Sequence, residues 1–206
     1  MIKLYGFTLS NYFNMVKMGL LEKGLEYEFV ETQASQDDAY LSKSPMGKVP
    51  CIEAEGGFLS EANVILEYLD EVGSGPALMP KDPLQRARVR ELMKEMELYI
   101  ELPARTCFPE AFFGNKVSDE VKAKAKADLA KGVACLKRNG KFSPYVAGDT
   151  FTNADIIFQY SVGLASACAK RVLGMNLLED FPQAKALSEL INSRESAKQV
   201  AADQKK

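Results

Sequence analysis

The chain has 206 residues, 47% hydrophobic and 26% charged, a balance that is typical of a folded globular protein and excludes an intrinsically disordered one. Its net charge of −2 argues against a nucleic-acid partner, because such partners favour a basic surface. The sequence contains no histidine and its four cysteines lack CxxC spacing, so we expect no metal site and a chemistry that operates without imidazole.

The first part of the chain alternates strand and helix patterns. A strand is followed by apolar residues at helical spacing from Phe13 to Leu21, which Gly24 ends, and then by a second strand. Two short strands joined by a turn precede another helix, from about Glu61 to Glu71. The predicted strands comprise residues 2–6, 27–30, 49–52 and 57–59. This order of elements is thioredoxin-like.

A turn-rich stretch over residues 73–83 separates this part from a second one that is helical almost throughout. Apolar residues at helical spacing predict helices over residues 89–100 and 121–136. A further helix is expected to begin at Thr152, where Thr152 and Asp155 can form a capping box. Its continuation is apolar on nearly all sides, so we expect it at the buried centre of an all-α domain.

Three runs of sequence, in this order and spacing, resemble motifs of the glutathione transferase family. They are Ser44-Pro45-Met46-Gly47-Lys48-Val49-Pro50, Leu59-Ser60-Glu61-Ala62 and Thr152-Asn153-Ala154-Asp155. The resemblance covers nearly the whole chain and implies an α/β plus all-α fold. A thioredoxin-like N-terminal domain would occupy residues 1–76, followed by an all-helical C-terminal glutathione transferase domain over residues 84–206.

The Val49-Pro50 step is the first candidate for ligand binding. Proline lacks an N–H and tolerates the cis peptide, so Pro50 at the head of a strand can leave the preceding backbone free to pair with a ligand. The resemblance implies a cis Pro50 and a Val49 that pairs, as a strand would, with the cysteinyl part of glutathione. The alternative is a trans Pro50 that starts an edge strand. Lys48 matches a family position whose side chain reaches the glycyl carboxylate of glutathione. The alternative is that Lys48 is an exposed residue that only adds solubility.

Glu61 is expected at the start of a helix, where free N–H groups and the helix dipole favour an anion. By itself this position indicates only a residue that complements the dipole. The resemblance implies that Glu61 receives the γ-glutamyl ammonium of glutathione while its neighbour holds the carboxylate. That neighbour is usually Ser or Thr in the family but is Ala62 here. Ala62 offers no hydroxyl, so we expect weakened glutathione binding unless Ser60, Asn63 or water substitutes.

Ser10 is the candidate catalytic residue. The resemblance implies a reaction in which the glutathione thiolate is the nucleophile. A hydroxyl donor beside a helix N-terminus favours the thiolate over the thiol. Ser10 lies between the first strand and the first helix and matches the residue of the family's serine- and cysteine-type classes. Asn11, Tyr12 and a purely helix-capping role for Ser10 remain alternatives. Cys51 is expected to be a buried strand residue rather than a redox centre.

The resemblance implies a glutathione transferase whose co-substrate thiolate attacks a small hydrophobic electrophile, with no metal involved. A subsite for the electrophile would draw on Phe7, Tyr99, Phe108 and Phe112, although aromatic residues at helical spacing also suit a core. One alternative is a non-catalytic protein-binding module of the stringent starvation protein type, which Ala62 favours. Another is a glutathione-dependent peroxidase or isomerase, but the Ser-Ser-Cys run typical of maleylacetoacetate isomerases is absent.

The resemblance also implies a two-fold homodimer between the first domain of one subunit and the helical domain of the other. No segment has the features of a signal peptide, and no apolar run reaches the roughly 20 residues that span a bilayer. We therefore expect a cytoplasmic protein with no membrane partner.

Overall fold

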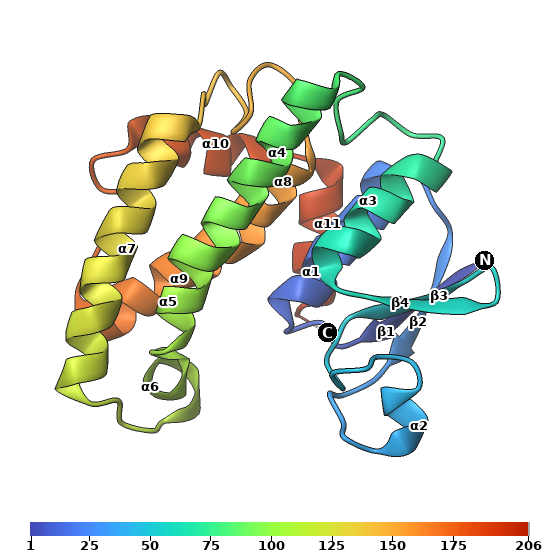
Figure 1. Cartoon of the computed structure of the whole chain (residues 1–206), viewed down its shortest axis with the longest axis horizontal. Helices are drawn as coiled ribbons and strands as arrows, with labels where there is room; N and C mark the ends of the chain where they lie inside the picture. The colour runs from blue at the N-terminus through green and yellow to red at the C-terminus, as the bar shows by residue number, and fades with distance from the viewer. Residues whose placement is uncertain (206) are drawn as a thin grey trace. The chain divides into compact units, whose positions relative to one another are not determined.

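The computed structural model describes residues 1–205, which form two compact units (Figure 1). The first unit joins Met1–Met79 to the C-terminal segment that begins at Asn192, and the second comprises Pro80–Ile191. Across the described residues, no helix combines the length and the apolar character needed to cross a membrane. The first unit is α/β and the second all-α, which confirms the expected fold class.

The first unit is built on a four-stranded sheet in the order β2-β1-β3-β4. Its strands are β1 (Ile2–Gly6), β2 (Tyr27–Glu31), β3 (Cys51–Ala54) and β4 (Gly57–Ser60). Strand β1 pairs parallel to β2 and antiparallel to β3, and β3 pairs antiparallel to β4. The alternating pattern therefore predicted the four strands correctly to within one or two residues at each end.

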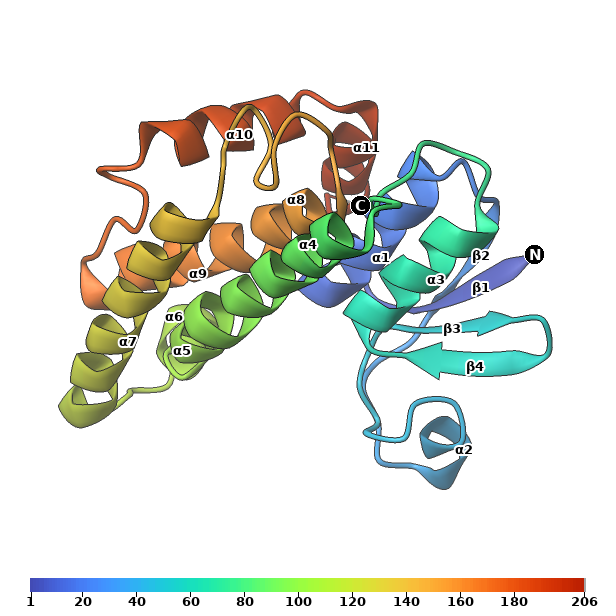
Figure 2. The ribbon, with the colours of Figure 1, turned by 45° about the horizontal axis from the view of Figure 1, so that its top comes forward.

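Two helices of the first unit, α1 (Asn11–Glu22) and α3 (Ala62–Val72), pack against each other over one face of the sheet (Figure 2). Gly19 of α1 permits their close approach, because a Cβ atom there would lie 2.5 Å from Cδ2 of Leu66. Between β2 and β3 the chain makes only a single short helix, α2 (Asp38–Leu41). The core under α1 and α3 contains Leu4, Phe13, Leu20, Ile52, Ile65 and Leu69, all fully buried.

The last helix, α11 (Glu195–Asp203), belongs to the first unit and packs along α1. Two ion pairs join these helices, Lys17 to Asp203 at 2.7 Å and Arg194 to Glu22 at 2.6 Å. The expected second domain, residues 84–206, includes α11, so the predicted domain ranges and the structural units differ at the C-terminus. The periodicity of an amphipathic helix gives its buried face but not the element against which that face packs.

The second unit consists of helices that include short one-turn π segments. They are α4 (Pro83–Met96), η1 (Glu97–Glu101), α5 (Leu102–Arg105), α6 (Phe108–Phe113), α7 (Asp119–Asn139), α8 (Asn153–Ile157), η2 (Phe158–Val162), α9 (Gly163–Cys168), η3 (Ala169–Leu173) and α10 (Pro182–Asn192). All residues of α8 are buried, which confirms that the helix beginning after Thr152 lies at the centre of its unit.

The start of α8 carries the predicted capping box. The Asp155 carboxylate accepts hydrogen bonds from the N–H groups of Val146, at 2.8 Å, and Thr152, at 2.7 Å. The Thr152 hydroxyl donates to the same carboxylate at 3.1 Å. Asp155 is fully buried, so these donors replace the water that it loses on folding. One side chain thereby fixes both the helix start and the preceding loop.

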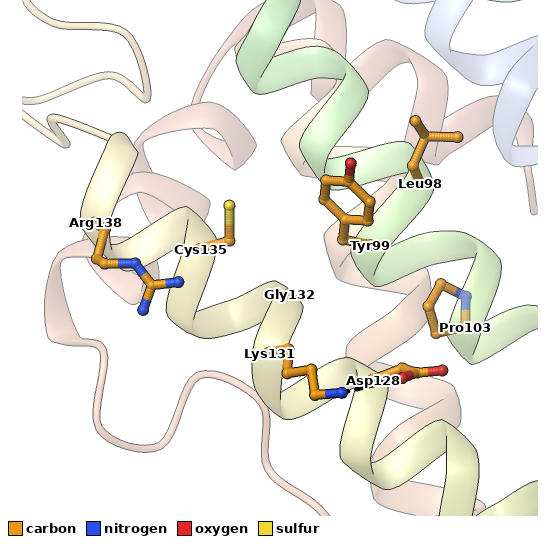
Figure 3. A pocket seen from close by; sticks show the side chains of 8 residues that line it. All are labelled: Leu98, Tyr99, Pro103, Asp128, Lys131, Gly132, Cys135 and Arg138. Atoms are coloured by element: carbon orange, nitrogen blue, oxygen red, sulfur yellow. Dashed lines mark ion pairs between the residues drawn. The ribbon is translucent and has the colours of Figure 1, made fainter.

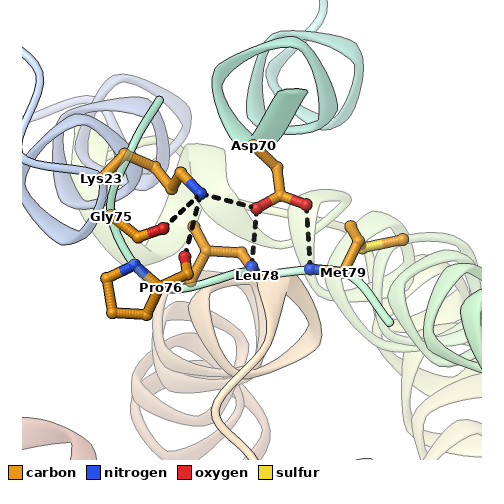
Figure 4. Close-up of polar contacts among 6 residues, drawn as sticks. All are labelled: Lys23, Asp70, Gly75, Pro76, Leu78 and Met79. Carbon is orange, nitrogen blue, oxygen red and sulfur yellow. Dashed lines mark hydrogen bonds and ion pairs between the residues drawn. The ribbon is translucent and has the colours of Figure 1, made fainter. Parts of the chain in front are cut away.

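A buried lysine organises the segment that leaves the first unit (Figure 4). The Lys23 ammonium, in a side chain only 2% exposed, donates to the Asp70 carboxylate at 3.0 Å and to the carbonyl groups of Gly75, at 3.0 Å, and Pro76, at 2.9 Å. Asp70 in turn accepts from the N–H groups of Leu78, at 2.6 Å, and Met79, at 3.1 Å. The two charges therefore fasten residues 75–79 to the ends of α1 and α3.

Replacing Asp70 by Asn should destabilise the fold by about 3 kcal/mol, because it leaves the buried Lys23 ammonium without a counter-charge. The free energy of unfolding in urea measures the effect. The matched control is Asp128→Asn, since Asp128 pairs with a largely exposed Lys124 on α7. We expect no measurable loss there, and equal losses in the two variants would contradict the account.

Candidate functional site

Three chain segments meet where β1 ends. In the register of the sheet, Tyr5 lies opposite Cys51, and Cys51 lies opposite Ser60. One step further along each strand, Pro50 is therefore placed between Gly6 on one side and Glu61 on the other. The sheet thus brings together the Val49-Pro50 step, Glu61 and the loop that leads from Gly6 to Ser10, although these segments are far apart in the sequence.

Two helices begin at this same end of the sheet, where β1 and β4 finish, which is called the edge below. Strand β4 runs parallel to β1, since both are antiparallel to β3, so α1 after β1 and α3 after β4 start on the same side. Ser10 is the N-cap of α1 and Glu61 the N-cap of α3. The first N–H groups of a helix have no partners within it, and its dipole is positive at that end. The edge therefore suits the binding of anionic groups.

The Val49-Pro50 peptide bond is cis, as the resemblance implied. The preceding carbonyl, that of Lys48, accepts hydrogen bonds from the Tyr40 hydroxyl at 3.0 Å and the Ser44 hydroxyl at 2.8 Å. Within residues 1–205 the Val49 backbone has no hydrogen-bond partner of its own. The loop is thus held on one side of Val49 while the Val49 N–H and C=O stay available. The supporting roles of Tyr40 and Ser44 were not predicted from the sequence.

Ser10 caps α1, because its hydroxyl oxygen accepts the N–H of Phe13 at 3.3 Å. The capping role that the sequence left as an alternative therefore exists. It does not compete with donation, since the hydroxyl hydrogen can still be given to another acceptor. The Ser10 N–H donates to the Phe7 carbonyl at 3.1 Å, which closes a turn ahead of the helix. Asn11 and Tyr12 follow in the first helical turn, both half-buried.

Glu61 has an unusual backbone conformation, with φ of 70° and ψ of 111°. A positive φ is uncommon for a residue with a side chain and costs of order 1–3 kcal/mol, so it persists only where neighbouring structure imposes it. The Glu61 side chain is exposed and makes no capping hydrogen bond to its own helix. Strained residues of this kind cluster at binding sites. No sequence pattern predicted the strained backbone of Glu61.

Two further predicted residues flank these positions. Ala62 is the first residue of α3 and is buried, with only 6% of its surface exposed. Lys48 is exposed beside the Val49-Pro50 step, a position that suits both of its predicted roles. All of the predicted site residues, Ser10, Lys48, Val49, Pro50, Glu61 and Ala62, lie in the first unit.

Cys51 follows Pro50 but is fully buried in β3, as predicted. Its sulfur lies 3.9 Å from the Tyr40 hydroxyl oxygen. Burial raises the pKa of the Cys51 thiol, and the hydrogen bond with Tyr40 and the charge of Lys43 offset this only partly. The thiol therefore stays protonated near neutral pH, where a nucleophilic or redox-active cysteine needs a thiolate.

The aromatic residues considered for an electrophile subsite come from both units. Phe7 is in the first unit, and the rings of Phe108 and Phe112 pack edge to face in the second, with centroids 5.1 Å apart. Tyr99 instead lines a hollow of about 470 Å³ between η1 and α7 (Figure 3). The other residues lining this hollow are Leu98, Pro103, Asp128, Lys131, Gly132, Cys135 and Arg138.

The hollow beside Tyr99 contains one thiol, that of Cys135. Burial raises the pKa of Cys135, and the nearby Glu95 carboxylate raises it further. The thiol is therefore a poor nucleophile at neutral pH. Among residues 1–205, no group of three or more acidic or cysteine side chains is placed to hold a metal ion.

Comparison with known proteins places this geometry in a family. Residues 4–77 match the family model described as glutathione S-transferase, N-terminal domain. The chain is 55% identical over 203 residues to a glutathione S-transferase of Pseudomonas putida, with 98% of this chain and 92% of the relative covered.

Two solved bacterial structures have the same fold. A glutathione S-transferase from Rhodospirillum rubrum is 27% identical with a TM-score of 0.77, covering 97% of this chain and 91% of its own. One from Pseudomonas fluorescens is 25% identical with a TM-score of 0.81, covering 95% and 96%. The fold and the family expected from the sequence are therefore confirmed, and the chain belongs to the glutathione S-transferase family of enzymes.

Proposed function

We propose that the chain conjugates glutathione to small hydrophobic electrophiles and that glutathione lies along the edge formed by Val49, Glu61 and Ser10. The observation that carries this proposal is the pairing register, which aligns Pro50 between Gly6 and Glu61 with two helix N-termini at the same edge. A peptide with two carboxylates and one ammonium group matches such an edge in charge.

The backbone at Val49 is the proposed anchor for the cysteinyl part of glutathione. Its N–H and C=O have no partner in the first unit and can pair with an extended peptide, as at the edge of a sheet. The ammonium of the γ-glutamyl group is assigned to the exposed Glu61 carboxylate. The carboxylate of the same γ-glutamyl group is assigned to the N–H of Ala62 at the start of α3. Lys48 is assigned to the glycyl carboxylate.

Ser10 is the proposed catalytic residue. Its hydroxyl accepts from Phe13 and can donate its hydrogen to the sulfur of glutathione, which favours the thiolate over the thiol. The proton of the thiol passes to solvent. The thiolate electron pair then forms the new carbon–sulfur bond, and the electrophile's leaving group departs with the electrons of the bond that breaks. No imidazole is needed, in agreement with the absence of histidine.

Three further features are part of the proposal. The electrophile would be a small hydrophobic molecule. The active form would be a two-fold homodimer in the cytoplasm. No metal would take part in the reaction.

Replacing Ser10 by Ala tests the catalytic assignment. A hydrogen bond to a charged group contributes roughly 1.5–3 kcal/mol, which corresponds to about 1–2 pKa units. The pKa of bound glutathione should therefore rise by about that amount, with about a 10- to 100-fold loss of kcat/KM at neutral pH, because less of the thiol is ionised. Ultraviolet titration of the bound thiolate and a conjugation assay with a broad electrophile measure both quantities.

The matched control is Ser118→Ala, because Ser118 caps α7 through Val121 just as Ser10 caps α1. Both variants should lose similar cap stability, of about 1 kcal/mol, but only Ser10→Ala should change the bound thiol. An unchanged thiol pKa in Ser10→Ala would contradict the assignment of Ser10. Failure of the unmodified protein to bind glutathione at millimolar concentration would reject the proposed function itself.

Replacing Ala62 by Ser should tighten glutathione binding by about tenfold or more, because the new hydroxyl can donate to the γ-glutamyl carboxylate. Isothermal titration measures the affinity. Cysteinylglycine is the control ligand: it lacks the γ-glutamyl group, so its affinity should not change. Equal tightening of both peptides would show that Ala62 does not face the γ-glutamyl group. No change for glutathione would contradict the expected weakening by Ala62 and mean that another donor already fills the place.

A further inference from the structure

Helix α11 is fastened to α1 at both of its ends. At its C-terminal end the Asp203 carboxylate accepts from the Lys17 ammonium at 2.7 Å and from the Gln199 amide at 2.9 Å. Lys17 is only 5% exposed although it carries a charge. A buried ammonium needs a counter-charge, so this pair depends on α11 remaining in place.

At the N-terminal end of α11 a second pair repeats the arrangement. Arg194 donates from Nε and Nη2 to the two carboxylate oxygens of Glu22, at 2.7 Å and 2.6 Å, and the Ser196 hydroxyl donates to the same group. Burial alone would raise the pKa of Glu22, but the hydrogen bonds from Arg194 and Ser196 outweigh it and the pKa is lowered. Glu22 is therefore ionised at neutral pH and the bidentate pair is intact.

From this docked position α11 reaches the loop that carries Ser10. The carbonyl of Thr8 accepts from the Asn14 amide at 2.8 Å and from the Gln204 amide, just past the end of α11, at 3.3 Å. The same loop is closed by the Ser10 N–H on the Phe7 carbonyl. The turn before Ser10 is thus held from α1 and from α11 at once.

We infer that α11 is a positioning element for the reaction, which holds the Thr8 carbonyl through Gln204 and thereby fixes where the Ser10 hydroxyl points. The inference rests on the proposed function of Ser10. Asp203 and Lys17 act indirectly, because their ion pair keeps the end of α11 against α1 and thereby places Gln204. Small misplacements of a catalytic group are costly, since donation to the sulfur depends on distance and angle.

The test compares two α11 variants with a control on the same helix. Gln204→Ala removes the bond to Thr8 at an exposed site and leaves the buried pair intact, so it does not endanger folding. Asp203→Asn removes the counter-charge of Lys17, and Asp203→Glu should rescue it. The control is Glu195→Gln, since the Glu195 side chain is 90% exposed and pairs with Lys198 of the same helix at 2.6 Å.

Both Gln204→Ala and Asp203→Asn should raise the pKa of bound glutathione and lower kcat by about tenfold while the KM for glutathione stays unchanged, because Val49 and Glu61 are untouched. Amide hydrogen exchange at Ser10 should be faster in both. If α11 has only a structural role, the two variants should be less stable, but the pKa of bound glutathione should not change and kcat should not fall at constant KM.

Ser10→Ala separates the failure of this inference from that of the proposed function. If Ser10→Ala raises the thiol pKa but Gln204→Ala and Asp203→Asn behave like Glu195→Gln in kcat, thiol pKa and exchange at Ser10, α11 does not position the loop. If Ser10→Ala leaves the thiol unchanged, the proposed role of Ser10 fails and a catalytic positioning role for α11 fails with it. The exchange rate at Ser10 then still reports whether α11 holds the turn.

Discussion

The pairing of β3 between β1 and β4 is the constraint on which the candidate site depends. Because side chains alternate along a strand, a shift of one residue in either register would carry Pro50 away from Gly6 and Glu61 and turn the core residues of β3 outward. The fully buried Ile52 in β3 and Leu4 in β1 oppose such a shift. The hydrophobic core of the first unit therefore also sets the alignment of the candidate ligand-binding edge.

This alignment concentrates unsatisfied polar groups at one place. The starts of α1 and α3, the open backbone of Val49 and the strained backbone of Glu61 all lie at the same edge of the sheet. Two buried lysines elsewhere in the first unit are instead paired with carboxylates, Lys23 with Asp70 and Lys17 with Asp203. An edge with free backbone donors and acceptors is what an extended peptide ligand requires.

Much of this arrangement could be predicted from the sequence, because it depends on local signals. The strands, the start of α8 at Thr152 and the cis Val49-Pro50 step follow from periodicity, capping chemistry and a family motif. Residues that act over a long separation could not be found in this way. Lys23 meets Asp70 across 47 positions and Glu22 meets Arg194 across 172, and a charged residue on a helix gives no local sign of such a partner.

Helix α11 likewise falls within the expected helical domain, residues 84–206, because it gives no local sign of its partner. Its apolar face, with Ala197 and Val200 buried, suits any helical partner. Its place in the first unit follows from long-range contacts with α1, among them the two ion pairs. The positive φ of Glu61 likewise arises from the turn between β4 and α3 rather than from the residue itself. Sequence patterns therefore describe the parts of the site better than the supports around it.

The most direct test of the central claim is a crystal structure of the chain with glutathione. We predict an extended tripeptide whose cysteinyl backbone pairs with Val49, whose γ-glutamyl end lies at Glu61 and whose sulfur is within hydrogen-bonding distance of the Ser10 hydroxyl. Glutathione bound in the hollow beside Tyr99, or a tripeptide that leaves the Val49 backbone unpaired, would contradict it.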